Sequence, residues 1–166
     1  DKPAAACAPA GKNKTLICFS DNLDRAIVTF ILANGAAATG SKVSIFFTFW
    51  GLNVIKKKHG PAVKKTLTEK MFAHMLPKSS DSLALSKMNM MGMGSKMIRG
   101  IMKKKNIDSL ESLIRQAMDN GVEFIACQMT MDMMGIKKEE LLDGVTVGGV
   151  ASYMQKAEEA GVNLFI

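Results

Sequence analysis

Short apolar runs alternate along the chain with longer segments in which apolar residues recur at helical spacing. An apolar run of about four to eight residues between turn-forming residues is typical of a buried β-strand, whereas an apolar period near ~3.6 indicates a helix. The runs predict strands at residues 14–20, 42–49, 122–127, 145–147 and 163–166. The periodic segments predict helices at residues 22–38, 63–75, 94–104, 108–120, 137–142 and 148–159.

The order of these segments predicts the fold class. Strand, helix and strand within residues 14–49 form a βαβ unit, whose crossover makes the two strands parallel. The same alternation returns in the second half of the chain, from residue 108 onward. We therefore expect an α/β fold, with a three-layer, open, mainly parallel five-stranded sheet and helices on both faces.

Two segments depart from this alternation. Residues 1–13 are rich in Ala, Pro, Gly and Lys without an apolar period, and they are predicted to form a flexible tail. Residues 14–166 are long and apolar enough for a single domain. Within that domain, residues 52–107 contain lysine clusters and many methionines, and we expect a helical excursion from the sheet, called the basic insertion below.

Positive charge is concentrated in the same insertion. The chain has a net charge of +7, but residues 51–105 hold 13 Lys and Arg against two acidic residues, so this segment is net +11 and the remainder net −4. The asymmetry indicates either an acidic or anionic partner for one face or a solvated lysine-rich surface. The lysines at 56–58 and 103–105 are the candidates for attracting such a partner. Nucleic acid is not expected, because stacking aromatics do not interleave with the lysines.

The chain carries no membrane or export signal. No apolar run approaches the ~18 residues needed to cross a bilayer, and residues 1–10 lack the apolar core of a signal peptide. We expect a soluble, cytoplasmic protein, with a membrane surface as a less favoured partner. Three cysteines, Cys7, Cys18 and Cys127, lie at wide spacings that fit neither a disulfide framework nor a paired zinc site, so free thiols are predicted.

Most enzyme classes lack their signatures in this sequence. It contains no Gly-Lys-Ser/Thr phosphate loop, no G-x-G-x-x-G after the first strand and no G-x-S-x-G elbow. Its two histidines, His59 and His74, both fall in the basic insertion, so a Cys-His pair would need one of them to fold back onto Cys127. No cluster of His, Cys and carboxylates has metal-ligand spacing, and we expect neither a metal nor a cofactor.

What remains is sulfur chemistry at Cys127, where an apolar strand ends and a methionine-rich turn begins. A thiol at such a position suits a reactive sulfur, and the alternative is an inert, buried cysteine. Because ligands bind outside the carboxyl ends of the strands in open parallel sheets, we place the site at that edge. The candidate residues there are Cys18, Ser20, Asp21, Phe49, Trp50, Gly51, Cys127, Met129, Thr130, Met131, Gly148 and Gly149.

The two cysteines at this edge have distinct predicted roles. If Thr130 caps a short helix over residues 131–134, the free N–H groups of that helix favour the Cys127 thiolate. Cys18 is either a second, resolving thiol or an inert core residue.

The other candidates are predicted to bind or enclose the sulfur ligand. Trp50, Met129 and Met131 are expected to wall the pocket. Gly148 and Gly149 open a predicted helix whose free N–H groups would hold an anion, although a glycine pair also suits a plain turn.

Four stretches of the sequence together resemble a known family. They are Asn34-Gly35-Ala36-Ala37-Ala38-x-Gly40, residues 43–52 (VSIFFTFWGL), residues 126–135 (ACQMTMDMMG) and residues 148–153 (GGVASY). With them, the chain resembles the DsrE/DsrF-like family, in the branch described as peroxiredoxin-like or as DsrE-type sulfurtransferases. The resemblance covers nearly the whole chain after the tail.

The resemblance implies a parallel α/β fold related to that of flavodoxin, and homo-oligomers that are often trimers or hexamers. It also implies a cysteine that carries sulfane sulfur as a persulfide, and this cysteine falls on Cys127. The implied partners are sulfur donor and acceptor proteins or low-molecular thiols.

We therefore expect a sulfur-relay protein or sulfurtransferase in which Cys127 accepts sulfane sulfur and passes it to an acceptor thiol. The sequence leaves open whether the protein turns over as an enzyme or only carries sulfur. The alternative is a non-catalytic binding module, which would hold an anionic nucleotide or CoA-like ligand at the sheet edge or dock a protein or membrane on the basic insertion.

Overall fold

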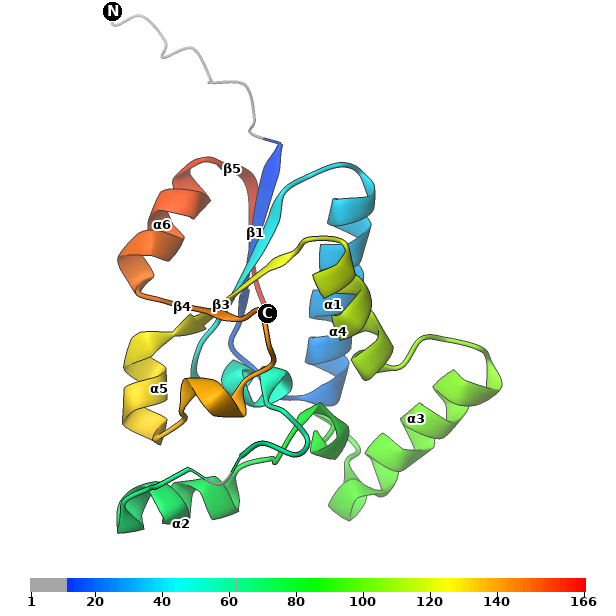
Figure 1. Cartoon of the computed structure of the whole chain (residues 1–166). Helices are drawn as coiled ribbons and strands as arrows, with labels where there is room; N and C mark the ends of the chain where they lie inside the picture. The colour runs from blue at the N-terminus through cyan, green and yellow to red at the C-terminus, as the bar shows by residue number, and fades with distance from the viewer. Residues whose placement is uncertain (1–11, 62) are drawn as a thin grey trace, which may run out of the picture.

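The computed structural model describes residues 12–61 and 63–166. Within these ranges, five strands form one sheet in the order β4-β3-β2-β1-β5, and every neighbouring pair is parallel (Figure 1). The strands are β1 (Asn13–Cys18), β2 (Val43–Phe47), β3 (Glu123–Cys127), β4 (Thr146–Gly148) and β5 (Ala160–Phe165). The predicted α/β class and the parallel five-stranded sheet are confirmed.

The strands differ most from their predicted bounds where the first and last of them meet. β1 begins at Asn13, and Lys12 forms an isolated bridge with Ala160, so these two residues of the predicted tail belong to the sheet. The rest of that tail, with Cys7, lies outside the described residues. β5 begins at Ala160, three residues before its predicted start, because its backbone pairs with β1 from Asn13 to Ile17.

Helices lie on both faces of the sheet, as predicted. α1 (Leu23–Ala38) and α4 (Leu110–Asp119) contact each other on one face, and α6 (Val150–Glu158) lies on the other (Figure 1). The helix predicted at residues 108–120 begins at Leu110, because Ser109 rather than Asp108 is its N-cap: the Ser109 hydroxyl accepts a hydrogen bond of 3.2 Å from the Ser112 N–H. These helices leave the carboxyl edge of the sheet free for the loops that form the site.

The two faces of the sheet bury different apolar clusters. The larger core lies against α1 and α4, and three aromatic rings at its centre, 5.4–6.2 Å apart, belong to Phe30, Phe47 and Phe124. The smaller cluster, on the α6 side, consists of Phe46, Ile125, Cys127 and Tyr153. Successive residues of a strand point to opposite faces, which explains why Phe46 and Phe47 lie in different clusters.

The basic insertion begins later than predicted. Residues 49–104 form the short 3₁₀ helices η1 (Phe49–Ile55), η2 (Ser80–Ser82) and η3 (Met90–Gly92), and the helices α2 (Leu67–Met75) and α3 (Met93–Lys104). Leu52, Val54 and Ile55 are fully buried, so η1 is part of the domain core and the boundary at residue 52 was wrong. The two predicted helices of the insertion correspond to α2 and α3, which lie beyond the carboxyl edge of the sheet (bottom of Figure 1).

The segment between β3 and β4 is less helical than predicted after residue 135. The helix expected at residues 137–142 is reduced to η4 (Lys138–Glu140), a single 3₁₀ turn. Across the described part of the chain, no helix is both long enough and apolar enough to cross a membrane.

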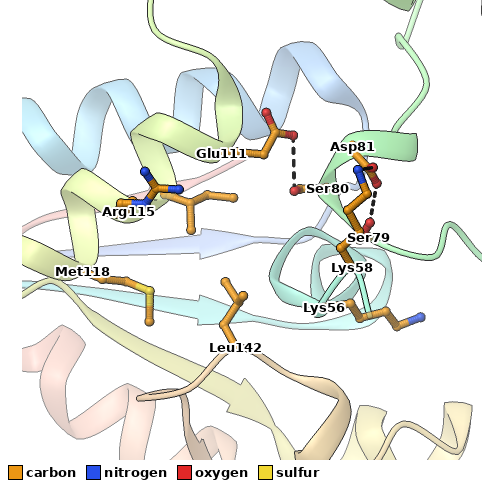
Figure 2. A pocket seen from close by; sticks show the side chains of 10 residues that line it. Lys56, Lys58, Ser79, Ser80, Asp81, Glu111, Arg115, Met118 and Leu142 are labelled. Carbon is orange, nitrogen blue, oxygen red and sulfur yellow. Dashed lines mark hydrogen bonds and ion pairs between the residues drawn. The ribbon is translucent and has the colours of Figure 1, made fainter. Parts of the chain in front are cut away.

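A cavity of about 510 Å³ lies where the basic insertion meets α4 (Figure 2). Its apolar lining includes Ile114, Met118 and Leu142. At its rim, the Nζ of Lys58 lies 2.8 Å from the Oδ2 of Asp81. The cavity is therefore apolar inside and charged at the mouth.

Candidate functional site

Cys127 is at once the last residue of β3 and the N-cap of the next helix, α5 (Gln128–Met134). The prediction that Thr130 caps a helix over residues 131–134 was wrong, because α5 starts at Gln128 and Thr130 lies in its first turn. This start has no signal in the sequence, since no Ser, Thr, Asn or Asp stands at the cap position. The thiol is thus one residue from a turn of free helix N–H groups.

Hydrogen bonds to the Cys127 sulfur favour its charged form. Burial raises the pKa of the Cys127 thiol, but the Thr130 hydroxyl, the Thr130 N–H, the Thr48 hydroxyl and the Met129 N–H lower it by more, so the pKa lies below the ordinary cysteine value. Thr130 and Met129 belong to α5 and Thr48 follows β2, so these groups come from the two segments that follow β3 and β2. The thiolate that acts as a nucleophile is therefore favoured at Cys127.

Thr48 is a site residue that the sequence analysis missed. Its Oγ1 lies 3.1 Å from the Oγ1 of Thr130, which also accepts a hydrogen bond of 3.4 Å from the N–H of Phe49. The register of the sheet pairs Phe47 with Ala126, so the next residue of each segment, Thr48 and Cys127, meet at the carboxyl edge. A polar residue directly after an apolar strand was the signal that could have identified Thr48.

The Cys127 side chain is covered on the α6 side of the sheet. The residue is 1% exposed and packs with Phe46, Ile125 and Tyr153. Beside it on α5, Met129 and Met133 are exposed. The thiol is consequently shielded from water, with an apolar surface next to it on the outside of α5.

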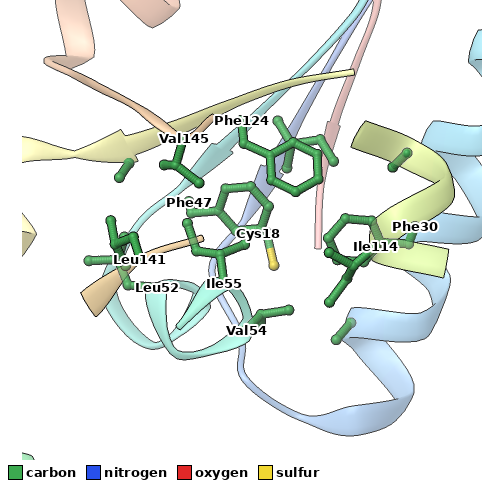
Figure 3. Packing of buried hydrophobic residues seen from close by; sticks show 14 of the residues in the cluster. Cys18, Phe30, Phe47, Leu52, Val54, Ile55, Ile114, Phe124, Leu141 and Val145 are labelled. Atoms are coloured by element: carbon green, nitrogen blue, oxygen red, sulfur yellow. The ribbon is translucent and has the colours of Figure 1, made fainter. Parts of the chain in front are cut away.

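Cys18 does not meet Cys127. Figure 3 shows Cys18 in the larger core, whereas Cys127 belongs to the cluster on the opposite face. β2 separates their strands, which puts their backbones about 9–10 Å apart, beyond the roughly 7 Å that a disulfide can span. The predicted role of Cys18 as a second thiol is not supported by this geometry.

The chemistry of Cys18 also argues against a reactive role. Burial raises the pKa of the Cys18 thiol to about 12; a hydrogen bond from Thr29 lowers it, and the Asp21 charge raises it. Its Sγ lies 3.6 Å from the Ser20 carbonyl oxygen, to which the thiol donates. Cys18 is therefore a protonated core residue at neutral pH.

Several predicted pocket residues surround the end of β1 rather than Cys127. The Oγ of Ser20 accepts a hydrogen bond of 3.1 Å from the N–H of Asn22, and the Oδ2 of Asp21 accepts one of 2.9 Å from the Nδ2 of Asn53. Gly51 packs directly on the Cys18 backbone. These residues support the loop structure and are not placed at the thiol.

Only some of the residues predicted to line the pocket lie near the Cys127 thiol. Met131 is buried in the larger core, on the face away from Cys127, so its predicted role as a wall was wrong. Met129 contributes its N–H to the sulfur, and its side chain is exposed. Phe49 contacts Thr130 through its N–H, and Trp50 is exposed at the start of η1.

Gly148 and Gly149, at the carboxyl end of β4, lie beside Cys127. Gly148 pairs with Cys127 in the register of the sheet, and Gly149 is the N-cap of α6. A Cβ on Gly148 would lie 2.9 Å from Ile125 and 3.0 Å from Ser152, so only glycine fits there. Their role in binding an anion stays a prediction. Among the described residues, no group of three His, Cys, Asp or Glu is arranged to hold a metal ion.

Comparison with known proteins identifies the family. The sequence profile of the DsrE/DsrF/DrsH-like family matches residues 10–165. The uncharacterized protein YrkE of Bacillus subtilis is 49% identical over 155 residues, covering 93% of this chain and 97% of YrkE. The sulfur carrier protein DsrE2 of Allochromatium vinosum is 37% identical over 156 residues, covering 93% of this chain and 98% of DsrE2.

Two solved structures share the fold. The ychN protein of E. coli aligns with a TM-score of 0.51 and 10% identity, over 93% of this chain and 98% of its own. A protein of unknown function from Methanobacterium thermoautotrophicum aligns with a TM-score of 0.53 and 13% identity, over 93% of this chain and 99% of its own. Because the family profile matches residues 10–165, the chain belongs to the DsrE/DsrF/DrsH-like family.

Proposed function

We propose that this protein is a sulfur carrier in which Cys127 holds sulfane sulfur as a persulfide. The Cys127 thiolate attacks the outer sulfur of a donor persulfide, R–S–SH; the donor S–S bond breaks, and R–S⁻ leaves with the bonding electron pair. The product is Cys127–S–SH. An acceptor thiolate then attacks the outer sulfur, and Cys127 leaves as a thiolate. The transfer needs no external oxidant or reductant, because the sulfur moves between thiols with its bond to hydrogen unchanged.

The hydrogen bonding around Cys127 is the observation that carries this proposal. Two hydroxyl groups and two backbone N–H groups lower the pKa of the thiol against the effect of burial. The same donors stabilise Cys127 when it acts as attacking thiolate and again when it acts as leaving group. Both halves of the transfer therefore use one arrangement of Thr48, Thr130 and the first turn of α5.

The comparisons support the same role. The relative that is 37% identical over nearly its whole length is named as a sulfur carrier protein. The name of the relative that is 49% identical gives no function. We transfer from the former only the carriage of sulfur, and the persulfide on Cys127 is our own proposal, which the lowered pKa of this thiol supports.

Donor and acceptor proteins would approach over α5. Met129 and Met133 form an exposed apolar surface next to the thiol, and α2 of the basic insertion contacts α5. In the loop after α5, the Nζ of Lys137 lies 3.3 Å from the Oε1 of Glu69 in α2. An apolar surface beside a lysine-rich segment suits an acidic carrier protein that presents its own thiol, or an anionic low-molecular thiol.

Mass spectrometry after exposure to a persulfide donor tests the proposal. The protein is incubated with glutathione persulfide, desalted and measured intact. A gain of about 32 Da, the mass of one sulfur, that disappears with dithiothreitol is the expected result for a persulfide. A protein that stays at its original mass while a rhodanese control is loaded would contradict the proposed function.

The Thr130 hydroxyl should control the reactivity of Cys127. In Thr130→Val, iodoacetamide should alkylate Cys127 about tenfold more slowly at neutral pH, because a hydrogen bond to a charged group contributes about 1.5–3 kcal/mol. Since the thiolate is the reactive form, the midpoint of the rate against pH should move upward. Thr130→Ser keeps a hydroxyl and should retain most of the reactivity. If the valine and serine variants show equal alkylation rates at every pH, the Thr130 hydroxyl does not control the reactivity of Cys127.

We also propose that the chain assembles into a homo-oligomer through the edge strand β5. Val162, Leu164 and Phe165 are exposed on this strand, and Phe165 is 68% exposed. Exposed apolar residues on an unpaired strand edge favour association. Native mass spectrometry should show a trimer or hexamer that Val162→Lys dissociates. The matched control, Met91→Lys, adds the same charge at an exposed residue of η3 and should leave the assembly intact. A monomer at every concentration would rule out the assembly.

A further inference from the structure

A second cavity, distinct from the Cys127 site, has four lysines among its nine lining residues. It has a volume of about 190 Å³, several times the roughly 30 Å³ that one water molecule occupies. Four lysines and one carboxylate contribute to its lining: Lys56, Lys57, Lys58, Lys78 and Glu140. The cavity therefore has the size and the charge to hold a small anion.

Lys56 is the most buried charged group in this lining. It follows the fully buried end of η1 and is only 9% exposed. Its backbone is fixed on both sides, because the Leu142 N–H donates to the Ile55 carbonyl at 2.9 Å and the Lys57 N–H to the Glu140 carbonyl at 2.8 Å. In Figure 2 its ammonium points away from Leu142. The backbone that carries this buried side chain is thus held in place beside the cavity.

The acidic groups around Lys56 have other partners. The Oε1 of Glu140 lies 2.7 Å from the Nζ of Lys65, and Asp21 accepts from Asn53. The ion pairs and side-chain hydrogen bonds found among the described residues do not include the Lys56 ammonium. A buried cation without a direct ion pair is costly, which leaves Lys56 suited to an anion from solution.

The other lysines of the cavity differ in their pairing. Lys57 lies 2.8 Å from Asp143 and Lys58 lies 2.8 Å from Asp81, each measured between Nζ and a carboxylate oxygen. Lys78 is exposed at the rim. Burial lowers the pKa of Lys56 to about 8; the charges of Glu140 and Asp21 raise it, and that of Lys65 lowers it. A bound anion would favour the charged form of this lysine and raise its pKa again.

We propose that this cavity binds a compact oxyanion, of the phosphate or sulfate type, with Lys56 as its central ligand. The site is independent of sulfur transfer at Cys127. The cavity shares Lys56 and Lys58 with the larger, apolar cavity of Figure 2. The oxyanion is therefore either a free ion or the head group of a ligand whose apolar part lies against Met118 and Leu142.

Isothermal titration calorimetry with inorganic phosphate tests the site, with sodium chloride of equal ionic strength as reference. Lys56→Met should weaken phosphate binding at least about tenfold, the effect of losing a charge-assisted hydrogen bond. Lys105→Met, which removes the same charge from an exposed position outside the cavity, should bind phosphate as the unmodified protein does. Lys56→Gln serves as a second variant, and circular dichroism confirms that each variant is folded.

Three results would overturn the proposal: no phosphate binding beyond that of chloride, equal binding by Lys56→Met, or equal weakening by Lys105→Met. A titration with hexyl phosphate separates the two sources of the oxyanion. Tighter binding than phosphate, reduced by Met118→Asp, indicates a head group with an apolar tail. Equal binding of the two compounds indicates a free oxyanion, and either result supports the site at Lys56.

Discussion

Cys127→Ser should abolish sulfur loading, whereas Cys18→Ser should load as well as the unmodified protein. Cys127 is the thiol whose pKa is lowered by hydrogen bonding, and serine cannot form a persulfide. Cys18 is buried on the other face of the sheet, and its pKa is raised to about 12. Intact mass after exposure to glutathione persulfide measures the loaded fraction, which should fall from near complete to background in Cys127→Ser alone.

The loading experiment has a built-in control for folding. Serine at position 127 keeps the size and the hydrogen-bonding capacity of the cysteine at the N-cap of α5, where serine is a favoured residue. The variant should therefore unfold at or above the temperature of the unmodified protein. If loading persists in Cys127→Ser and disappears in Cys18→Ser, Cys18 rather than Cys127 carries the sulfur, and the proposed function is wrong.

Gly51→Ala should destabilise the fold by about 3 kcal/mol or more. A Cβ on Gly51 would lie 2.0 Å from the Cys18 carbonyl oxygen and 2.7 Å from its carbon, and both are backbone atoms that cannot move aside locally. The Gly51 N–H also donates to the carbonyls of Phe19 and Thr48, so a shift of η1 would break the contact between β1 and the Thr48 loop. Overpacking in a filled core typically costs about 1–3 kcal/mol, and a backbone clash costs more.

Gly35→Ala is the matched control for that substitution. Gly35 is exposed within α1, and a Cβ there would meet nothing within 4 Å. Alanine in a helix interior is favoured over glycine by about 0.5–1 kcal/mol, so the unfolding midpoint in urea should rise slightly. If Gly51→Ala unfolds at the same denaturant concentration as Gly35→Ala, the close packing of η1 on Cys18 is not a structural requirement.

The fold could be predicted because the patterns that determine it lie in short, continuous segments of the sequence. The apolar runs of β1, β2 and β3 are continuous, as expected for strands covered on both faces, and the helices between them force parallel pairing. Cys127 could be placed at the carboxyl edge for the same reason. The start of β5 could not be predicted, because Ala160 and Gly161 are poor strand formers and are extended only through pairing with β1.

The surroundings of the thiol were harder to predict, because they depend on register and on the direction of side chains. Thr48 reaches Cys127 only because Phe47 pairs with Ala126. Met131 and Met129 are two residues apart, yet one is buried in the core and the other is exposed, because α5 begins at Gln128 rather than after Thr130. A cap formed by a cysteine has no sequence signature. The start of α5, and the side-chain directions that depend on it, therefore could not be predicted.

The packing of α6 has a consequence for how partners would recognise the carrier. Tyr153 is the buried residue of this helix, and its hydroxyl lies 3.2 Å from the Thr15 hydroxyl across the cluster that covers Cys127. A sulfur atom added to Cys127 needs space that Tyr153 and Phe46 now fill, and α6, in which Tyr153 is the one buried residue, yields more readily than the sheet does. The filled and empty carriers would then differ in shape on the outside of α6. A donor could select the empty form and an acceptor the filled one, which would give the relay its direction.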